Sequence, residues 1–286
     1  MTTRFAAAKI NLALHVTGRR EDGYHLLDSA VMFAADAGDL VTVAPADKLG
    51  LSITGPFSEG LETDGNNLVL KAVEALNKVC ARRLRPCHIT LEKHLPVASG
   101  IGGGSADAAA ALNALMAFNA MEVPADQLVG IALELGADVP VCLASAACRM
   151  RGIGEEIEPW TSTPDLQAVL VNPRVAVSTA AIFKTLALLP GQPAGTGMGE
   201  MPARSDCLDW LAGCRNDLQP AACDLQPVIG LVLEAIAATD ACRLARMSGS
   251  GATCFGLFDD ADAAGVAAER LRQAHPGWWV AATRLV

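Results

Sequence analysis

The stretch Pro96-Val97-Ala98-Ser99-Gly100-Ile101-Gly102-Gly103-Gly104-Ser105-Ala106-Asp107 runs directly into an alanine-rich segment, residues 108–116. Four glycines within five positions exclude the interior of a strand or a helix, whereas alanine favours a helix. The first N–H groups of such a helix have no acceptor within it, and these donors and the helix dipole both attract anions. The stretch therefore predicts a loop that binds an anion at a helix N-terminus, and we expect phosphate.

Two well-known phosphate-binding patterns do not match this glycine-rich loop. The dinucleotide pattern G-x-G-x-x-G needs glycine at Ser105 and follows a strand directly, not a turn such as residues 96–99. A Walker loop ends in Gly-Lys-Ser or Gly-Lys-Thr, and the sequence contains no Gly-Lys dipeptide. A glycine-rich turn that merely starts a helix is the structural alternative.

Length and composition indicate a soluble protein with two domains or one large domain. At 286 residues the chain exceeds the usual size of a single core. Although 51% of the residues are hydrophobic, we find no run of about 18 uncharged apolar residues that could span a bilayer. The first residues are too often polar for a signal peptide. A net charge of −9 argues against nucleic-acid and membrane partners.

The cysteines favour a reducing compartment. There are nine of them, an odd number at irregular spacings, and no Cys-x-x-Cys pair suggests a zinc or redox centre. We therefore expect reduced thiols in a cytoplasmic protein.

Residues 5–16 read as a strand in which Lys9 and Asn11 lie on or near the polar face. A lysine in an apolar strand costs desolvation free energy unless it meets an anion, and Asn11 offers both a donor and an acceptor. An edge-strand lysine that reaches solvent is the alternative.

Further on, Asp22-Gly23 marks a tight turn that presents Tyr24 and His25. These rings could bind a planar ligand, or Tyr24 could pack over its own loop.

The Asp138 carboxylate is a candidate functional group because of the turn in which it lies. It follows the helix stop Gly136 in the short apolar turn Ala137-Asp138-Val139-Pro140. A carboxylate held in such a turn needs a cation or a proton donor nearby. A helix cap or a surface turn is the alternative.

Periodicity and turn residues predict the remaining elements. Strands are expected over residues 40–44, 49–54, 88–95, 166–171, 243–247, 254–258 and 278–285, and helices over residues 67–79, 106–120, 125–135, from 178 onward, and 260–272. Residues 190–202 contain five glycines or prolines between their ends and little periodicity, so we expect a mobile loop.

The glycine-rich loop resembles the ATP loop of the galactokinase, homoserine kinase, mevalonate kinase and phosphomevalonate kinase (GHMP) superfamily. The matching residues are Pro96, Gly100, Ile101, Gly102, Gly103, Gly104, Ser105 and Ala106. Residues 8–12, Ala-Lys-Ile-Asn-Leu, are similar to the first motif of the superfamily, and residues 248–251, Ser-Gly-Ser-Gly, to the third. The resemblance covers nearly the whole chain. It implies an α+β fold with an ATP-binding domain over residues 1–159, a second domain over residues 160–286, and an active site in the cleft between them.

This resemblance implies that the protein binds ATP and Mg²⁺. The residues expected at the nucleotide are Asn67, Lys93, Pro96, Gly100, Gly102, Gly103, Gly104 and Ser105. Ser105 is also the expected magnesium ligand. Two of these residues have ordinary alternatives, because Asn67 could cap a helix and Lys93 could be a solvated strand charge.

The resemblance also assigns catalytic roles. Gly-Ala-Asp-Val-Pro is similar to the catalytic aspartate segment of the family, which makes Asp138 the expected base. Lys9 is expected to hold Asp138 and the migrating phosphoryl group, with Asn11 beside the accepting hydroxyl. Alternatively, Asp138 only orients the hydroxyl.

Within the superfamily, Arg-x-Asp-Gly-Tyr-His at residues 20–25 is similar to the branch that phosphorylates 4-diphosphocytidyl-2-C-methylerythritol in non-mevalonate isoprenoid synthesis. This likeness implies that Tyr24 stacks on the cytosine, that His25 hydrogen-bonds it, and that Phe183 lies near the cytosine, opposite Tyr24. Packing of Phe183 in the core is the alternative. The third motif is expected to close over the phosphates and contact the substrate. Its residues are Gly249, Ser250 and Gly251.

Three rival functions are open at this point. A kinase for homoserine or mevalonate would make the Tyr-His pair incidental. A nucleotide-binding regulatory protein would need neither Lys9 nor Asp138, and a dinucleotide oxidoreductase would need the glycine pattern that fails here. We expect a small-molecule substrate and a monomer or weak homodimer.

Overall fold

The computed structural model describes residues 1–79, 84–202 and 207–286, and the chain divides into two compact units. The first unit comprises Met1–Ala8, Gly38–Val97 and Gly102–Ser145, and the second comprises Lys9–Ala37, Ala98–Ile101 and Ala146–Val286. They are interleaved in sequence because two long strands, β1 (Thr2–Arg19) and β2 (His25–Pro45), each contribute to both. The compact units therefore do not coincide with a single boundary near Pro159.

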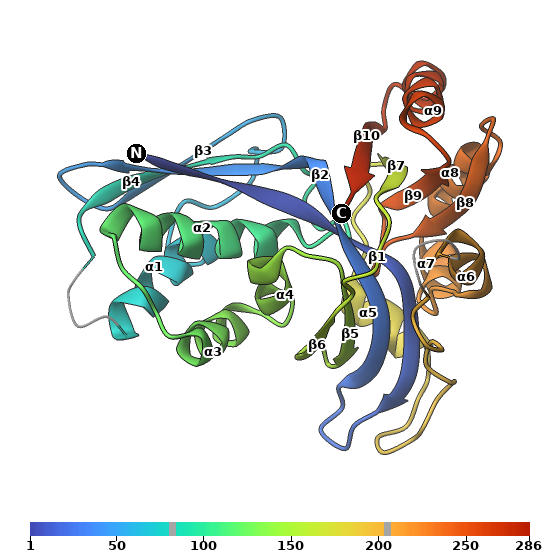
Figure 1. The fold of residues 1–286 in the computed structure, drawn as a ribbon, viewed down its shortest axis with the longest axis horizontal. Helices are drawn as coiled ribbons and strands as arrows, with labels where there is room; N and C mark the ends of the chain where they lie inside the picture. The colour runs from blue at the N-terminus through green and yellow to red at the C-terminus, as the bar shows by residue number, and fades with distance from the viewer. Residues whose placement is uncertain (80–83, 203–206) are drawn as a thin grey trace. The chain divides into compact units, whose positions relative to one another are not determined.

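The first unit places helices against one face of a small sheet (Figure 1). β4 (Cys87–Glu92) pairs antiparallel with β2 and parallel with β3 (Gly50–Thr54). The helices are α1 (Leu68–Val79), α2 (Gly103–Asn119), α3 (Ala125–Leu135) and α4 (Val139–Ala144). α2 contacts the other three, and its small alanine side chains allow this close packing.

The second unit contains a four-stranded antiparallel arrangement in the order β10-β7-β9-β8. These strands are β7 (Leu166–Asn172), β8 (Cys242–Met247), β9 (Cys254–Phe258) and β10 (Trp279–Leu285). β5 (Cys148–Gly152) pairs with both β2 and β6 (Glu156–Pro159). The helices are α5 (Thr179–Thr185), α6 (Cys207–Gly213), α7 (Gln219–Leu225), α8 (Val228–Ala237) and α9 (Ala261–Ala274). In the described part of the chain, no helix is both long and apolar enough to cross a membrane.

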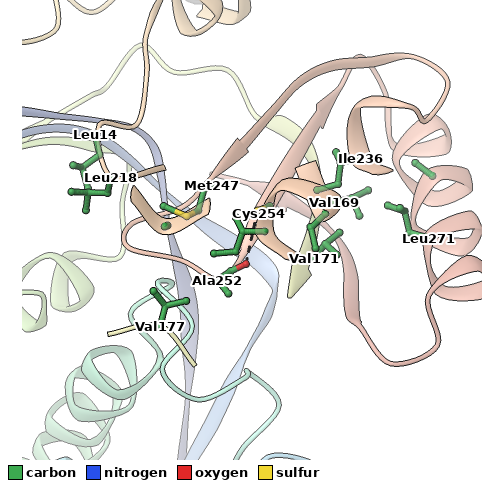
Figure 2. Close-up of a cluster of buried hydrophobic side chains, with 14 of the residues drawn as sticks. Leu14, Val169, Val171, Val177, Leu218, Ile236, Met247, Ala252, Cys254 and Leu271 are labelled. Carbon is green, nitrogen blue, oxygen red and sulfur yellow. Dashed lines mark hydrogen bonds between the residues drawn. The ribbon is translucent and has the colours of Figure 1, made fainter. Parts of the chain in front are cut away.

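A hydrophobic cluster joins the strands and helices of the second unit (Figure 2). It includes Val171 of β7, Ile236 of α8 and Leu271 of α9, all of them buried. Burying one such aliphatic side chain contributes about 1.5–3 kcal/mol. The cluster extends to Ala252 and Cys254, which follow the second glycine-rich segment, residues 248–251. That segment is therefore anchored in a packed core.

The α+β fold class is confirmed, but several elements differ from the sequence-based expectations. The strand expected over residues 40–44 is only the end of β2, which begins at His25. Residues 28–34 of β2 are all buried, so they lack the alternation that marks a strand with one exposed face. α2 begins at Gly103 and not at Ala106, because the glycines themselves form its first turn.

Residues 190–202, expected to be a mobile loop, are instead held by hydrogen bonds to β1 and β2. The N–H of Gly191 donates to the carbonyl of Arg19 at 2.8 Å. Further along, the N–H of Met198 donates to the Asp28 carboxylate at 2.7 Å, and Arg149 binds the same carboxylate. Long-range partners therefore fix a segment whose composition alone suggests mobility.

Candidate active site

The glycine-rich loop turns through residues with positive φ. Ala98, Gly100 and Gly102 have φ values of 51°, 74° and 66°. Glycine adopts this left-handed backbone region without steric cost. At Gly100 space also demands glycine, because a Cβ atom there would lie 2.6 Å from the backbone nitrogen of Gly251. The two glycine-rich segments therefore meet backbone to backbone.

Hydrogen bonds join the first half of this loop to the second glycine-rich segment within the second unit. The carbonyl of Ser99 accepts the Thr253 N–H at 3.1 Å, and the carbonyl of Gly100 accepts the Ser248 hydroxyl at 3.2 Å. A Cβ atom at Gly249 would lie 2.6 Å from the Gly100 oxygen. Two motifs that are about 150 residues apart in the sequence thus form one backbone surface.

Strand β1 supplies polar residues to the same place. The N–H of Lys9 donates to the Ile101 carbonyl at 2.9 Å, and the N–H of Asn11 donates to the Ser248 hydroxyl at 3.0 Å. The Asn11 side-chain amide donates to the Ser29 hydroxyl at 2.7 Å. Lys9 is only 3% exposed, which excludes the alternative of an edge lysine reaching solvent. Lys9 and Asn11 are thus buried polar residues beside the glycine-rich loop.

Asn216 supports the second glycine-rich segment, a role that the sequence did not reveal. Its side-chain amide donates to the carbonyls of Met247 and Gly249, both at 2.8 Å. The hydroxyls of Ser250 and Thr179 lie 2.7 Å apart. Nothing in the local sequence around Asn216 indicates these distant partners.

The N-terminus of α2 has the donors that an anion site requires. Gly102 is its N-cap, and no side chain caps the helix. The N–H groups of Gly103, Gly104 and Ser105 consequently have no acceptor within the helix. Gly104 is exposed and Ser105 is half-buried, so a ligand can reach this first turn. Together with the dipole of a 17-residue helix, these donors suit a phosphate group.

Lys93 lies behind this first turn, in a buried cluster with Asp39 and Asp107. Its ammonium group donates to both carboxylates, at 2.7 Å in the case of Asp107. Lys93 is only 4% exposed, so the alternative of a solvated strand charge is wrong. Asp107 lies in the second turn of α2 and not the first, and its carboxylate binds this lysine. Asp39 was not predicted as a site residue, because its only signal in the sequence is a charge within an otherwise apolar part of β2.

Burial shifts the proton affinities in this cluster. It raises the pKa of Asp107 to about 7, because the opposing effect of the Lys93 ammonium is weaker and the Asp39 carboxylate adds to the rise. Burial acts to lower the pKa of Lys93, but the carboxylates of Asp107 and Asp39 outweigh it and the net pKa is raised. Among the described residues, Oδ1 of Asp107 has no hydrogen-bond partner. The cluster can therefore hold an additional proton near neutral pH.

Asp138 is the N-cap residue of α4, where it is half-buried. Its backbone carbonyl accepts the N–H of Cys142, but its side chain makes no capping hydrogen bond to the helix. The alternative of a capping carboxylate therefore does not hold. Asn67 does follow its ordinary alternative, because its Oδ1 accepts the Val69 N–H at 2.9 Å at the start of α1.

Two of the expected cytosine-binding residues meet in the second unit. The rings of His25 and Phe183 stack with centroids 4.6 Å apart and an interplanar angle of 24°. Burial, followed by the charge of Arg19, lowers the pKa of His25. Nε2 of His25 is buried without a hydrogen-bond partner in the described part of the chain. Tyr24, by contrast, is 61% exposed.

Comparison with known proteins shows to which family this chain belongs. The family model for the GHMP kinases N terminal domain matches residues 67–146, and that for the GHMP kinases C terminal domain matches residues 204–277. A 4-diphosphocytidyl-2-C-methyl-D-erythritol kinase of Cereibacter sphaeroides is 52% identical, with 100% of both chains covered. The chain belongs to this kinase family. A second relative of the same name, from Rhizobium etli, is 48% identical and covers 99% of this chain and 95% of its own.

Solved structures agree with membership in the 4-diphosphocytidyl-2-C-methyl-D-erythritol kinase family. A crystal structure of 4-(cytidine 5'-diphospho)-2C-methyl-D-erythritol kinase superposes with a TM-score of 0.79 at 33% identity, over 99% of this chain and 98% of that one. Homoserine kinase from Cytophaga hutchinsonii has a TM-score of 0.69 at 17% identity, covering 100% of this chain and 97% of its own. The second likeness shows the fold alone. The chain is thus a GHMP kinase with an α+β fold, and the roles of single residues stay predictions.

Proposed function

We propose that the protein transfers the γ-phosphoryl group of ATP to the 2-hydroxyl of 4-diphosphocytidyl-2-C-methyl-D-erythritol, giving the 2-phosphate and ADP in non-mevalonate isoprenoid synthesis. Full-length identity of 52% to a kinase of that name is the observation that carries this proposal. A phosphoryl transfer of this type depends mainly on aligning the two substrates and on neutralising the negative charge of the phosphoryl oxygens.

The ATP phosphates bind at the N-terminus of α2 in this proposal. The N–H groups of Gly102, Gly103, Gly104 and Ser105 are the donors, since a helix N-terminus offers both unpaired N–H groups and a favourable dipole. Pro96 and Gly100 shape the approach to this turn, and Asn67 contributes near the base while also capping α1. The observation in support is that this first turn is accessible and carries no side-chain cap.

The donor set suits a magnesium ion that is held mostly by phosphates. Among the described residues, no three His, Cys, Asp or Glu side chains gather as a metal site, and the Asp107 carboxylate is engaged by Lys93. Magnesium at nucleotide sites commonly has one or two protein ligands, the rest being phosphate oxygens and water. Ser105, half-buried in the first turn of α2, is the residue that would hold it. When bound, the ion neutralises charge on the phosphate oxygens.

Asp138 and Lys9 carry the chemistry in this proposal. Asp138 takes the proton of the accepting hydroxyl, and Lys9 stabilises the charge of the migrating phosphoryl group. Asn11 contributes polar contacts beside the hydroxyl. Gly249, Ser250 and Gly251 contact the substrate from the second glycine-rich segment, to which β1 is hydrogen-bonded through Asn11. A role for Asp138 in orientation alone is the competing assignment.

The stacked pair of His25 and Phe183 supports recognition of a cytosine ring. Buried Nε2 of His25 has no partner in the described part of the chain, so a ligand group that hydrogen-bonds it would remove a desolvation cost. Phe183 offers a flat apolar face, and exposed Tyr24 can close on the other side of the base. A kinase for homoserine or mevalonate would have no use for this pair.

We also propose that the protein acts in the cytoplasm, as a monomer or weak homodimer. All eight cysteines that the structure describes are free thiols, as a reducing compartment requires.

The experiment that tests the proposed function compares acceptors and one variant. ADP release is measured with 4-diphosphocytidyl-2-C-methyl-D-erythritol, homoserine and mevalonate, and His25→Ala is compared with wild type. We expect turnover with the cytidyl acceptor only, and a KM for that acceptor raised about tenfold to hundredfold in His25→Ala, with the KM for ATP unchanged. His275→Ala is the matched control. Turnover with homoserine or mevalonate, or an unchanged KM in His25→Ala, would contradict the proposal.

A further inference from the structure

Lys93, Asp39 and Asp107 form a cluster of three charged side chains that are almost fully buried. Their side chains are 5%, 0% and 5% exposed. Two carboxylates face one ammonium group, so the cluster has no surplus positive charge to offer a polyphosphate. Lys93 is therefore not placed to act as a simple cationic ligand of the nucleotide.

The cluster connects the two ends of the glycine-rich loop. Oδ1 of Asp39 accepts the N–H groups of His94 at 2.5 Å and Leu95 at 2.8 Å, immediately before the loop begins at Pro96. At the other end, Asp107 belongs to α2 and accepts from the Lys93 ammonium at 2.7 Å. One buried lysine therefore links the segment entering the loop to the helix leaving it.

Lys93 also lies directly behind the first residue of α2. A Cβ atom built on Gly103 would be 3.3 Å from Nζ of Lys93 and 3.9 Å from Oδ2 of Asp39. The backbone of the first turn thus rests on the cluster. Displacement of the lysine would change how the N–H groups of this turn point.

We infer that Lys93 is a positioning residue, which with Asp39 and Asp107 fixes the first turn of α2 in the orientation that binds the ATP phosphates. This inference rests on the proposed function only in naming ATP as the ligand. It changes the role expected for Lys93, which acts through the loop and not by contact with the nucleotide. It also gives Asp107 and Asp39 a part in nucleotide affinity.

Asp107 offers a clean pair of variants. Asp107→Ala removes one of the two carboxylates that accept hydrogen bonds from Lys93, the one on α2, whereas Asp107→Asn keeps an oxygen acceptor of nearly the same shape there. Asp126→Ala removes a carboxylate at an exposed position of α3 that is not part of the cluster, and it is the control. The melting temperature of each variant is recorded so that affinities are compared between folded proteins.

The experiment measures the Kd of Mg-ATP by calorimetry without any acceptor, and then kcat and both KM values with the cytidyl acceptor. We expect Asp107→Ala to weaken Mg-ATP binding about tenfold, a loss of one hydrogen-bonded link, without changing the KM for the acceptor. Asp107→Asn is expected to restore the Kd to within about twofold of wild type.

Three results would overturn the inference. Wild-type affinity in folded Asp107→Ala would mean that the link does not matter. Tighter binding in that variant would mean that the released ammonium contacts phosphate directly. Equal losses in Asp107→Asn and Asp107→Ala would mean that charge matters and not the link. Because Mg-ATP binding is read without acceptor, a wild-type protein that binds Mg-ATP but phosphorylates another alcohol would refute the proposed substrate alone.

Discussion

Asp138 occupies a backbone position that is restricted on its C-terminal side. It precedes the six-residue helix α4, and Pro140 lies in the first turn of that helix. Proline fixes φ and so stiffens the segment that carries the carboxylate. Because the side chain does not cap α4, its oxygens are not committed to the N–H groups of that helix. These features suit a base that must keep a constant position relative to a hydroxyl group.

The Asp138→Asn variant tests this role. The amide has nearly the same shape but cannot accept a proton, so we expect kcat to fall about 10²-fold to 10⁴-fold while the Kd of Mg-ATP stays within about twofold of wild type. Single-turnover kinetics and calorimetry measure the two quantities. Asp126→Asn, an exposed aspartate of α3, is the control. Turnover at the wild-type rate in Asp138→Asn would exclude the base and leave only orientation.

Two glycine-rich segments are brought together at the scale of elements. Gly100 has no space for a side chain, because its Cβ atom would lie 2.6 Å from the backbone nitrogen of Gly251, and Ser248 adds a hydrogen bond to the same contact. The first segment precedes α2 and the second precedes β9, which is part of the packed core of the second unit. The position of the loop is therefore set by tertiary packing as well as by its own glycines.

The variants Gly100→Ala and Gly60→Ala separate the contribution of tertiary packing from that of the glycine backbone conformation. Both glycines have left-handed φ values, 74° and 75°, but a Cβ atom at Gly60 meets nothing within 4 Å. Gly60→Ala should therefore lose only the conformational term, about 1–2 kcal/mol. Gly100→Ala adds a backbone collision, so we expect a clearly larger fall in melting temperature and a raised Kd for Mg-ATP. Equal effects of the two variants would refute the close approach of the two segments.

Local composition made the glycine-rich loop and the helix after it predictable from the sequence. Hydrogen-bond and ion-pair partners that are distant in the sequence were not predictable. Lys93 and Asp39 are 54 residues apart in the sequence, and no periodicity links them. The same limit explains residues 190–202, where glycine and proline suggest mobility but Asp28 and β1 supply hydrogen bonds. β2 was largely missed because burial on both faces removes the alternation on which strand prediction depends.

At the scale of the whole molecule, the Asp107 cluster links stability to pH. The pKa of Asp107 is raised from 3.8 to about 7, so between these values the folded state binds more protons than the unfolded state. The stabilisation from this proton is present at low pH and is lost as the pH rises towards 7. The contribution of this group to the free energy of unfolding changes by at most about 1.4 kcal/mol for each pH unit.

Asp107→Asn removes this titration and keeps the shape of the side chain. We expect the stability of wild type relative to Asp107→Asn to fall between pH 5 and about pH 7 and then to level off. Thermal melts at several pH values measure the difference, with Asp126→Asn as the exposed control. A difference independent of pH would show that Asp107 does not titrate in this range.

The central claim, phosphorylation of the 2-hydroxyl, is tested most directly by proton-coupled phosphorus NMR of the product formed from Mg-ATP and 4-diphosphocytidyl-2-C-methyl-D-erythritol. Carbon 2 carries the methyl group and no hydrogen, so a phosphate on its oxygen has no proton three bonds away. We predict a new monophosphate ester signal without proton splitting, together with ADP. A new ester split by neighbouring protons would place the phosphate on another hydroxyl, and the absence of any new ester would contradict the kinase assignment.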